Sequence, residues 1–250
     1  MARELAGRGA EVLVHGRSRA RGDAVVEELR GQTGNPRLHL HLADLASLDE
    51  VRRLADEVAA AHDRLHTLVN NAGIGTGPRE ESADGYELRF AVNYLSHFLL
   101  THRLLGLLRR SAPARIVNVA SAGQQQLDFD DVMLERDYDG FRAYAQSKLA
   151  QVMFTLDLAE VLPADEVTVN VLHPASLMDT KMVRETFGRP WTGVEEGRDA
   201  TLRLIVDPEL DGVTGRYFDG TRDAAPNPQA LNPEARRRLR ELSERLTGVG

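Results

Sequence analysis

Short apolar runs alternate along this chain with longer stretches in which apolar and polar residues recur at helical spacing. The runs are rich in Val, Ile and Leu and have the length of strands, whereas the stretches between them have the length of helices. Six strands are predicted in this way: EVLVH, RLHLHL, TLVNN, RIVNV, VTVNVL and GRYFD. Because such alternation is typical of a parallel sheet wrapped by helices, an α/β fold with a doubly wound parallel sheet is expected.

Two of the predicted helices carry clear signals. From Tyr86 to Arg110, apolar side chains recur at spacings of three and four, which predicts a helix with one buried face. This stripe consists of Leu88, Ala91, Val92, Leu95, Phe98 and Leu99. The last helix is predicted to start at Asn232, an N-cap residue type, with Pro233 in its first turn. No repeat or low-complexity linker is found, so residues 1–250 are expected to form one domain.

Composition and charge exclude several classes of function. The chain has 250 residues, 42% hydrophobic and 28% charged, which is enough for a full core. Its formal charge is −7 and no basic run is interleaved with aromatics, so nucleic acid is not expected as a partner. The basic cluster around Arg236 has glutamates beside it, which favours a solvated helix face.

The absence of cysteine excludes disulfides, thiol catalysis and cysteine-ligated zinc, and no metal site is expected. No segment approaches the roughly 18 consecutive apolar residues of a membrane-spanning helix. Arg3 and Glu4 stand where a signal peptide would have its apolar core. A soluble, cytoplasmic protein without a membrane span is therefore expected.

The segment FRAYAQSKLA contains the clearest candidate for chemistry. Tyr144 and Lys148 are four residues apart on an amphipathic helix, so their side chains lie on one face, one turn apart. A phenol is a poor acid or base at neutral pH, but a neighbouring ammonium favours the phenolate and lowers its pKa. The pair is a plausible device for proton transfer, although Tyr-x-x-x-Lys on its own also occurs by chance.

Polar residues follow two other predicted strands. RIVNVAS brings Ser121 to the carboxyl end of a buried strand, the edge at which open parallel sheets bind ligands. LVNNAG ends with Asn70, Asn71, Ala72 and Gly73, and Asn93 stands within an otherwise apolar helix. A hydroxyl at the position of Ser121 could hold a substrate oxygen while Tyr144 gives or takes its proton.

These segments, in this order, resemble the short-chain dehydrogenase/reductase family over essentially the whole chain. The matching segments are Asp44-Leu45, NNAG, Asn93, Ser121, the Tyr144/Lys148 pair and HPAS around Pro174. DYDGFRAYAQSKLAQVMFTLDLAE is similar to the retinol-dehydrogenase-like branch. The resemblance implies a Rossmann-like fold and an oxidoreductase that reduces a carbonyl or oxidises a secondary alcohol by hydride transfer.

The resemblance also implies a role for each matching residue. Tyr144 would be the general acid or base, and Lys148 would lower the pKa of Tyr144 and hold the nicotinamide ribose. Ser121 would orient the substrate oxygen, and Asn93 would anchor a water that relays protons to Lys148. The hydride chemistry itself would belong to the nicotinamide cofactor.

Further positions would bind this cofactor, and they are Asp44, Leu45, Asn71, Ala72, Gly73, Leu177 and Thr180, together with Tyr144 and Lys148. Arg17 stands where an NAD-specific relative often has a carboxylate, and a guanidinium suits a 2′-phosphate. NADP(H) is therefore favoured, with NAD as the alternative. Arg17 could also be a solvated loop residue.

The segment after the predicted strand VTVNVL, which is the sixth when the family's absent first strand is counted, departs from the family pattern. Ala175 and Ser176 replace the usual glycine and threonine region, and Thr180 comes one position late, so the carboxamide contact falls on Leu177 or Thr180. The segment from Met178 to Trp191 is expected to cover the substrate. Its large apolar side chains, which suggest an apolar substrate or plain packing, are Met178, Met182, Phe187 and Trp191.

The family begins with a strand and a glycine-rich turn that lets a pyrophosphate approach the backbone, whereas MARELAGRGA matches the helix that follows this turn. The fold is thus expected to be N-terminally incomplete, with two strands lacking a neighbour. A misplaced start, a cut chain and a naturally short chain remain open as explanations. The loop GIGTGP is not expected to replace the turn.

Two other functions remain open besides the oxidoreductase. One is a binding or regulatory protein that keeps the fold without turnover, and the other is an isomerase or lyase that uses Tyr144 and Lys148 without net redox change. The helices that carry Asn93 and Tyr144 could pair across a two-fold axis, so a homodimer or homotetramer is possible.

Overall fold

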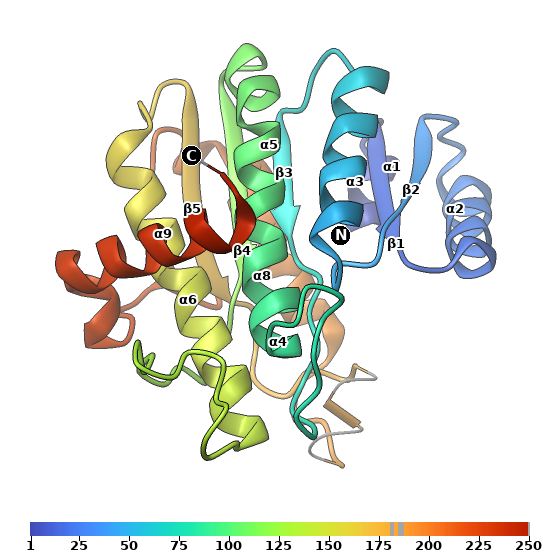
Figure 1. Ribbon diagram of the computed structural model, residues 1–250. Helices are drawn as coiled ribbons and strands as arrows, with labels where there is room; N and C mark the ends of the chain where they lie inside the picture. The colour runs from blue at the N-terminus through green and yellow to red at the C-terminus, as the bar shows by residue number, and fades with distance from the viewer. Residues whose placement is uncertain (181–182, 185–187, 250) are drawn as a thin grey trace.

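The computed structural model describes residues 1–180, 183–184 and 188–249, and it contains the predicted alternation of strands and helices (Figure 1). The strands are β1 (Val12–Gly16), β2 (Leu38–Leu42), β3 (Thr67–Asn70), β4 (Ala114–Val119), β5 (Val167–His173), β6 (Tyr217–Asp219) and β7 (Arg222–Asp223). The longer helices are α1 (Ala2–Gly7), α2 (Arg19–Thr33), α3 (Leu48–Ala61), α5 (Ser96–Arg110), α6 (Gly140–Val161), α8 (Val194–Val206) and α9 (Pro233–Thr247). All six predicted strands are confirmed to within two residues.

The strands hydrogen-bond in two groups, β1-β2 and β3-β4-β5-β6-β7. All neighbours are parallel except β6 and β7, and β7 is a two-residue strand that the apolar pattern does not reveal. No ladder joins β1 to β3 in the part of the chain that the structure describes, so each has a single neighbour. Figure 1 shows the β1-β2 pair beside β3, at one side of the larger sheet. The doubly wound α/β fold is confirmed.

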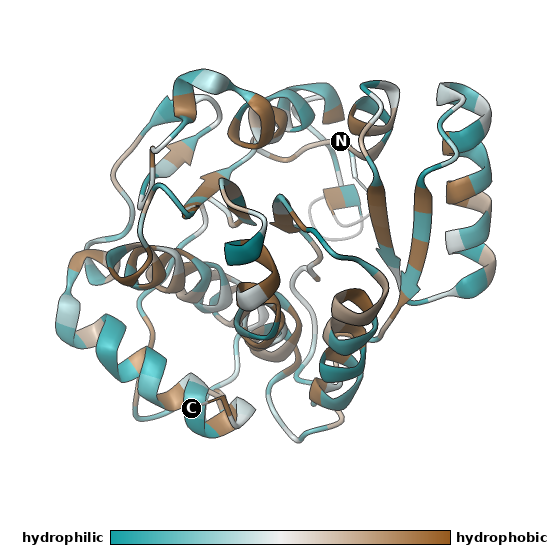
Figure 2. Ribbon diagram, turned by 90° about the horizontal axis from the view of Figure 1, so that it is seen from above, coloured by the Kyte–Doolittle hydropathy of each residue, from teal (hydrophilic) through white to brown (hydrophobic). Residues whose placement is uncertain are grey.

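Helices cover both faces of these strands. One core joins the central strands to α3, α5 and α6, and a second core joins the opposite face of β4 and β5 to α8 and α1. In β4, Ile116 belongs to the first core, whereas Val117 and Val119 belong to the second, as the alternation of side chains along a strand requires. Figure 2 shows the apolar positions gathered on the strands and the inward helix faces.

The helix predicted from Tyr86 to Arg110 begins later and is not uniformly α-helical. It starts with α4 (Leu88–Phe90), continues as a π-helical segment η1 (Ala91–Leu95) and becomes α5. The predicted stripe is buried except for Leu88, which is partly exposed. Asn93 lies within the π-helical segment, and such segments often occur at functional sites.

The final helix begins as predicted but buries part of its basic cluster. The Asn232 side chain accepts from the amides of Glu234 at 2.9 Å and Ala235 at 3.3 Å. Arg236 is only 6% exposed and donates to Glu160 of α6 and to the Ala230 carbonyl, so the expectation of a fully solvated face is wrong. The charge pattern of α9 does not reveal this burial, because it gives no information on the packing of α9 against α6.

The loop from Gly73 to Pro78 contacts both Arg89 of α4 and the start of α6. The buried Arg89 donates to the carbonyls of Gly75 at 3.1 Å and Pro78 at 2.7 Å. At the start of α6, a Cβ added to Gly140 would lie 2.4 Å from the carbonyl oxygen of Gly77. The helix can approach this loop so closely only because position 140 has no side chain.

We therefore expect Gly140→Ala to destabilise the protein by about 1–3 kcal/mol, because the loop backbone must move to admit the methyl group. Gly31→Ala in α2 is the control, because nothing lies within 4 Å of its added Cβ. It should leave stability unchanged or raise it by about 0.5–1 kcal/mol through helix propensity. Urea unfolding of both variants measures this, and equal stabilities would contradict the close approach.

Candidate active site

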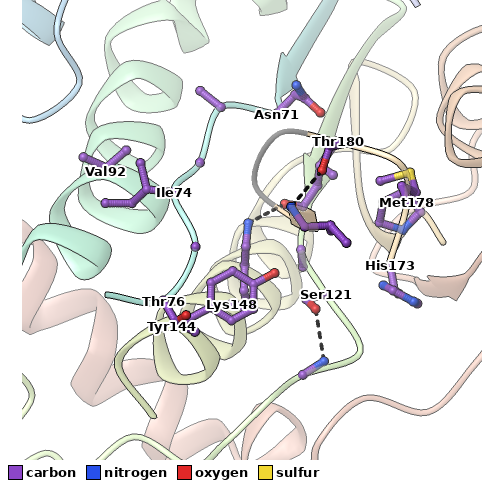
Figure 3. A pocket seen from close by; sticks show the side chains of 18 of the residues that line it. Asn71, Ile74, Thr76, Val92, Ser121, Tyr144, Lys148, His173, Met178 and Thr180 are labelled. Carbon is purple, nitrogen blue, oxygen red and sulfur yellow. Dashed lines mark hydrogen bonds between the residues drawn. The ribbon is translucent and has the colours of Figure 1, made fainter. Parts of the chain in front are cut away.

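A cavity of about 680 Å³ lies at the carboxyl ends of β1, β3, β4 and β5 (Figure 3). Because these strands are parallel, their carboxyl ends share one edge of the fold, and the loops that follow them meet there. Eleven of the predicted site residues line the cavity, namely Arg17, Asp44, Leu45, Asn71, Ala72, Gly73, Ser121, Tyr144, Lys148, Leu177 and Thr180. The twelfth, Asn93, lies behind the wall.

Ser121 and Tyr144 face the same part of this cavity. A Cβ added to Gly123 would lie 3.6 Å from Ser121 Oγ and 3.9 Å from Tyr144 Cε1, so the hydroxyl and the ring flank one small space. Burial raises the pKa of the Tyr144 phenol, whereas a lowering by Lys148 was expected, and hydrogen bonding by the Ser121 hydroxyl only partly offsets this rise. A protonated phenol beside a hydroxyl can donate to a substrate oxygen.

Lys148 brings an ammonium into this apolar wall. Its Nζ donates to the Val119 carbonyl at 3.0 Å and to Gln151 Oε1 at 2.8 Å, and it lies 5.9 Å from the centre of the Tyr144 ring. The residue is 5% exposed, and burial lowers the pKa of its amine to about 7. An amine with this pKa can both give and accept a proton near neutral pH.

Asn93 fixes the loop that forms one wall. Its Oδ1 accepts from the Ile74 amide at 2.8 Å, and its Nδ2 donates to the Ile74 carbonyl at 3.1 Å and to Ser147 Oγ at 2.9 Å. The side chain thereby joins the loop after β3 to α6, the helix of Tyr144 and Lys148. A Cβ at Gly73 would lie 3.1 Å from Asn93 Oδ1, so glycine permits this contact.

The residues expected to bind a dinucleotide form the other end of the cavity. Arg17 NH1 lies 3.9 Å from Asp44 Oδ2, and both side chains remain substantially exposed. Asp44 Oδ1 accepts from the Ala46 amide at 3.0 Å, which fixes the carboxylate after β2. Gly73 and Lys148 come together at the middle, where an added Cβ would lie 3.6 Å from Nζ. Arg17, Asp44, Gly73 and Lys148 thus all line one cavity.

The pyrophosphate end of the cavity differs from the usual arrangement. No glycine-rich turn between a strand and a helix lines the cavity in residues 1–180, 183–184 and 188–249. Gly73 and Gly75 of the loop after β3 line the cavity, but this loop leads to no described helix before Leu88.

The segment after β5 also lines the cavity. Leu177 has a φ of +45°, a left-handed conformation that is rare for a side chain of this type, and its carbonyl accepts from the Trp191 amide at 2.9 Å. Met178 and Trp191 line the cavity, and Trp191 is 77% exposed. The expectations for Met182 and Phe187 lie outside the described residues.

Sequence reasoning did not find His97 and Gln151. Gln151 Nε2 lies 2.9 Å from His97 Nδ1, so Lys148, Gln151 and His97 form one buried chain of hydrogen bonds. The available signal was spacing, because Gln151 follows Lys148 by three residues and His97 follows Asn93 by four on their helices. Burial lowers the pKa of His97 to about 3.

The lowered pKa of His97 predicts that the folded protein becomes less stable at acidic pH. A histidine whose pKa is lower in the folded state than the unfolded value of about 6.5 stabilises the fold above pH 6.5 and loses this contribution as pH falls toward 3. We expect the free energy of unfolding to fall by up to about 1.4 kcal/mol per pH unit from this residue. His97→Gln should flatten that slope between pH 6.5 and 4 in urea unfolding. An unchanged slope would contradict neutral burial.

Two properties of the described residues bear on the class of protein. No helix among them is long and apolar enough to cross a membrane. Among the same residues, no group of three or more histidine or acidic side chains is arranged to hold a metal ion.

Comparisons with known proteins agree with this geometry. The sequence profile of the short chain dehydrogenase family matches residues 1–190. Retinol dehydrogenase 13 from Mus musculus is 39% identical, and the match covers 98% of this chain and 79% of that protein. Polyprenol dehydrogenase from Mus musculus is also 39% identical, and the match covers 100% of this chain and 80% of that protein. Among solved structures, the Pseudomonas aeruginosa RhlG/NADP active-site complex is similar to this fold, with a TM-score of 0.69 and 27% sequence identity. The match covers 87% of this chain and 88% of that chain. The chain therefore belongs to the short-chain dehydrogenase family of oxidoreductases, in its retinol-dehydrogenase-like branch.

Proposed function

We propose that this enzyme is an NADP(H)-dependent oxidoreductase that interconverts an apolar carbonyl compound and the corresponding alcohol. The observation that carries the proposal is the convergence of Ser121, Tyr144 and Lys148 on one cavity at the carboxyl edge of the parallel sheet. Two elements that are separate in sequence, the loop after β4 and the helix α6, supply a hydroxyl, a phenol and an amine to one space. Such a set suits the proton step of a carbonyl reduction.

In the direction of reduction, Ser121 donates a hydrogen bond to the substrate carbonyl oxygen and orients it. Tyr144 transfers its phenolic proton to this oxygen as the carbon accepts hydride, so one C–H and one O–H bond form while the C=O double bond becomes single. NADPH, when bound, supplies the hydride. Lys148 stabilises the resulting phenolate, and oxidation follows the same steps in reverse.

The preference for NADP(H) rests on Arg17. Its guanidinium lies at the end of the cavity after β1, where its exposure leaves donors free for an anion. A 2′-phosphate accepts paired, charge-assisted hydrogen bonds from such a group. The NADP named for the Pseudomonas aeruginosa relative supports the same choice.

The apolar substrate class rests on the apolar side chains of the cavity lining. Ile74, Val92, Leu177, Met178, Val183 and Trp191 line the cavity. A wall of this kind binds by excluding water from a hydrocarbon group, not by directed hydrogen bonds. The relatives named for retinol and polyprenol support an apolar alcohol or its carbonyl form.

Replacing the phenol tests the proton step. We expect Tyr144→Phe to reduce kcat by at least about 100-fold because the general acid is lost, while the Kd for NADPH changes little. Tyr86→Phe is the control, because Tyr86 OH donates to the Leu246 carbonyl at 3.1 Å and the residue is not part of the cavity wall. Retinal reduction is followed by NADPH absorbance, and equal rates for the two variants would contradict the role of Tyr144.

Replacing the guanidinium tests the cofactor preference. We expect Arg17→Ala to weaken NADPH binding by about 10- to 100-fold and to leave NADH binding almost unchanged, because a charge-assisted hydrogen bond contributes about 1.5–3 kcal/mol. Arg19→Ala is the control, since Arg19 pairs with Asp23 on the surface of α2. Fluorescence titrations measure both constants. A parallel loss for NADH would contradict recognition of the 2′-phosphate.

A further inference from the structure

Lys148 is held in place before any ligand contacts it. An ammonium has three protons, and two of them go to the Val119 carbonyl and to Gln151 Oε1. The Val119 acceptor is backbone and belongs to β4, so no substitution in the sequence removes it. Gln151 is the side-chain partner, and it is 1% exposed.

The orientation of the Gln151 amide follows from the chemistry of its neighbours. Lys148 is only a donor, so the amide oxygen must face it, and the amide nitrogen must then face His97 Nδ1. A nitrogen that accepts from an amide carries no proton, so a neutral His97 has its proton on Nε2, an atom that has no hydrogen-bond partner among the described residues. The burial of His97, at 2% exposure, favours the neutral ring.

No carboxylate compensates for the burial of this ammonium. Burial alone accounts for the lowered pKa of Lys148, and the groups that face it are neutral: the β4 carbonyl, Gln151 of α6 and, beyond it, His97 of α5. The amide dipole is therefore the adjustable contribution to the charge of the lysine.

We propose that Gln151, oriented by neutral His97, is the positioning residue that fixes the Lys148 ammonium beside Tyr144 and sets how readily it gives up a proton. This inference rests on the proposed function for its catalytic consequence, whereas its physical part concerns Lys148 alone. Loss of the amide oxygen disfavours the ammonium. A carboxylate in its place favours it.

The sequence permits a direct measurement of this lysine. The chain contains only two lysines, Lys148 and Lys181, among 31 lysine and arginine residues. In a Lys181→Arg background, protein labelled with carbon-13 lysine gives one side-chain signal, and its Cε shift titrates with the amine. This readout needs neither cofactor nor turnover.

In this background we expect Gln151→Leu to lower the pKa of Lys148 by about one unit or more, and Gln151→Glu to raise it by a similar amount. Gln146→Leu is the matched control. Gln146 is also buried on α6, and among the described residues neither polar atom of its side chain has a hydrogen-bond partner, so its loss should leave the Lys148 titration unchanged. Thermal unfolding of each variant verifies that it is folded.

If Gln151→Leu and Gln146→Leu give the same Lys148 titration, the inference is overturned, and the same holds if Gln151→Glu fails to raise the pKa. When turnover is measured against pH, the part of the profile that reports the ionisation of Lys148 should shift in each variant by the same amount as the measured pKa of Lys148. A Lys148 that titrates as expected in an enzyme without NADPH-dependent turnover would support the positioning role and overturn the proposed function.

Discussion

The burial of one ammonium at the carboxyl end of a parallel strand governs the site. The Lys148 amine is buried in the apolar wall of the cavity, and its charged form is stable there only where hydrogen-bond acceptors replace the lost water. The β4 backbone provides one acceptor and Gln151 the other. The same contacts that make burial possible fix the position of the amine relative to Tyr144.

This requirement explains why the surroundings of the site are polar although they are buried. Asn93 joins the loop after β3 to α6, and His97 and Gln151 join α5 to the same helix. Further along, Asn70 donates to Asn118 at 2.8 Å, which links β3 to β4 beneath the cavity. A network in which each member orients the next holds side chains more rigidly than apolar packing does, because hydrogen bonds are directional.

The separation of the β1-β2 pair from the larger sheet concerns the end of the cavity that carries Arg17. β1 carries Arg17 at its carboxyl end, while β3 leads to Gly73, and no ladder joins the two strands in the described residues. The half of the cavity that carries Ser121, Tyr144 and Lys148 rests on the ladders among β3, β4 and β5. The half expected to bind the adenosine end rests on β1, β2 and their packing against α1 and α2.

The sequence by itself determined the strands, the fold class and the residues at the strand ends, because apolar periodicity and parallel topology are local or follow from simple rules. It also indicated Tyr144 and Lys148, since helical spacing alone places them on one face. It did not indicate the π-helical segment around Asn93, the burial of Arg236 or the support of Lys148 by Gln151 and His97. These features depend on which helices pack together, and only the tertiary structure decides which buried polar groups find a partner.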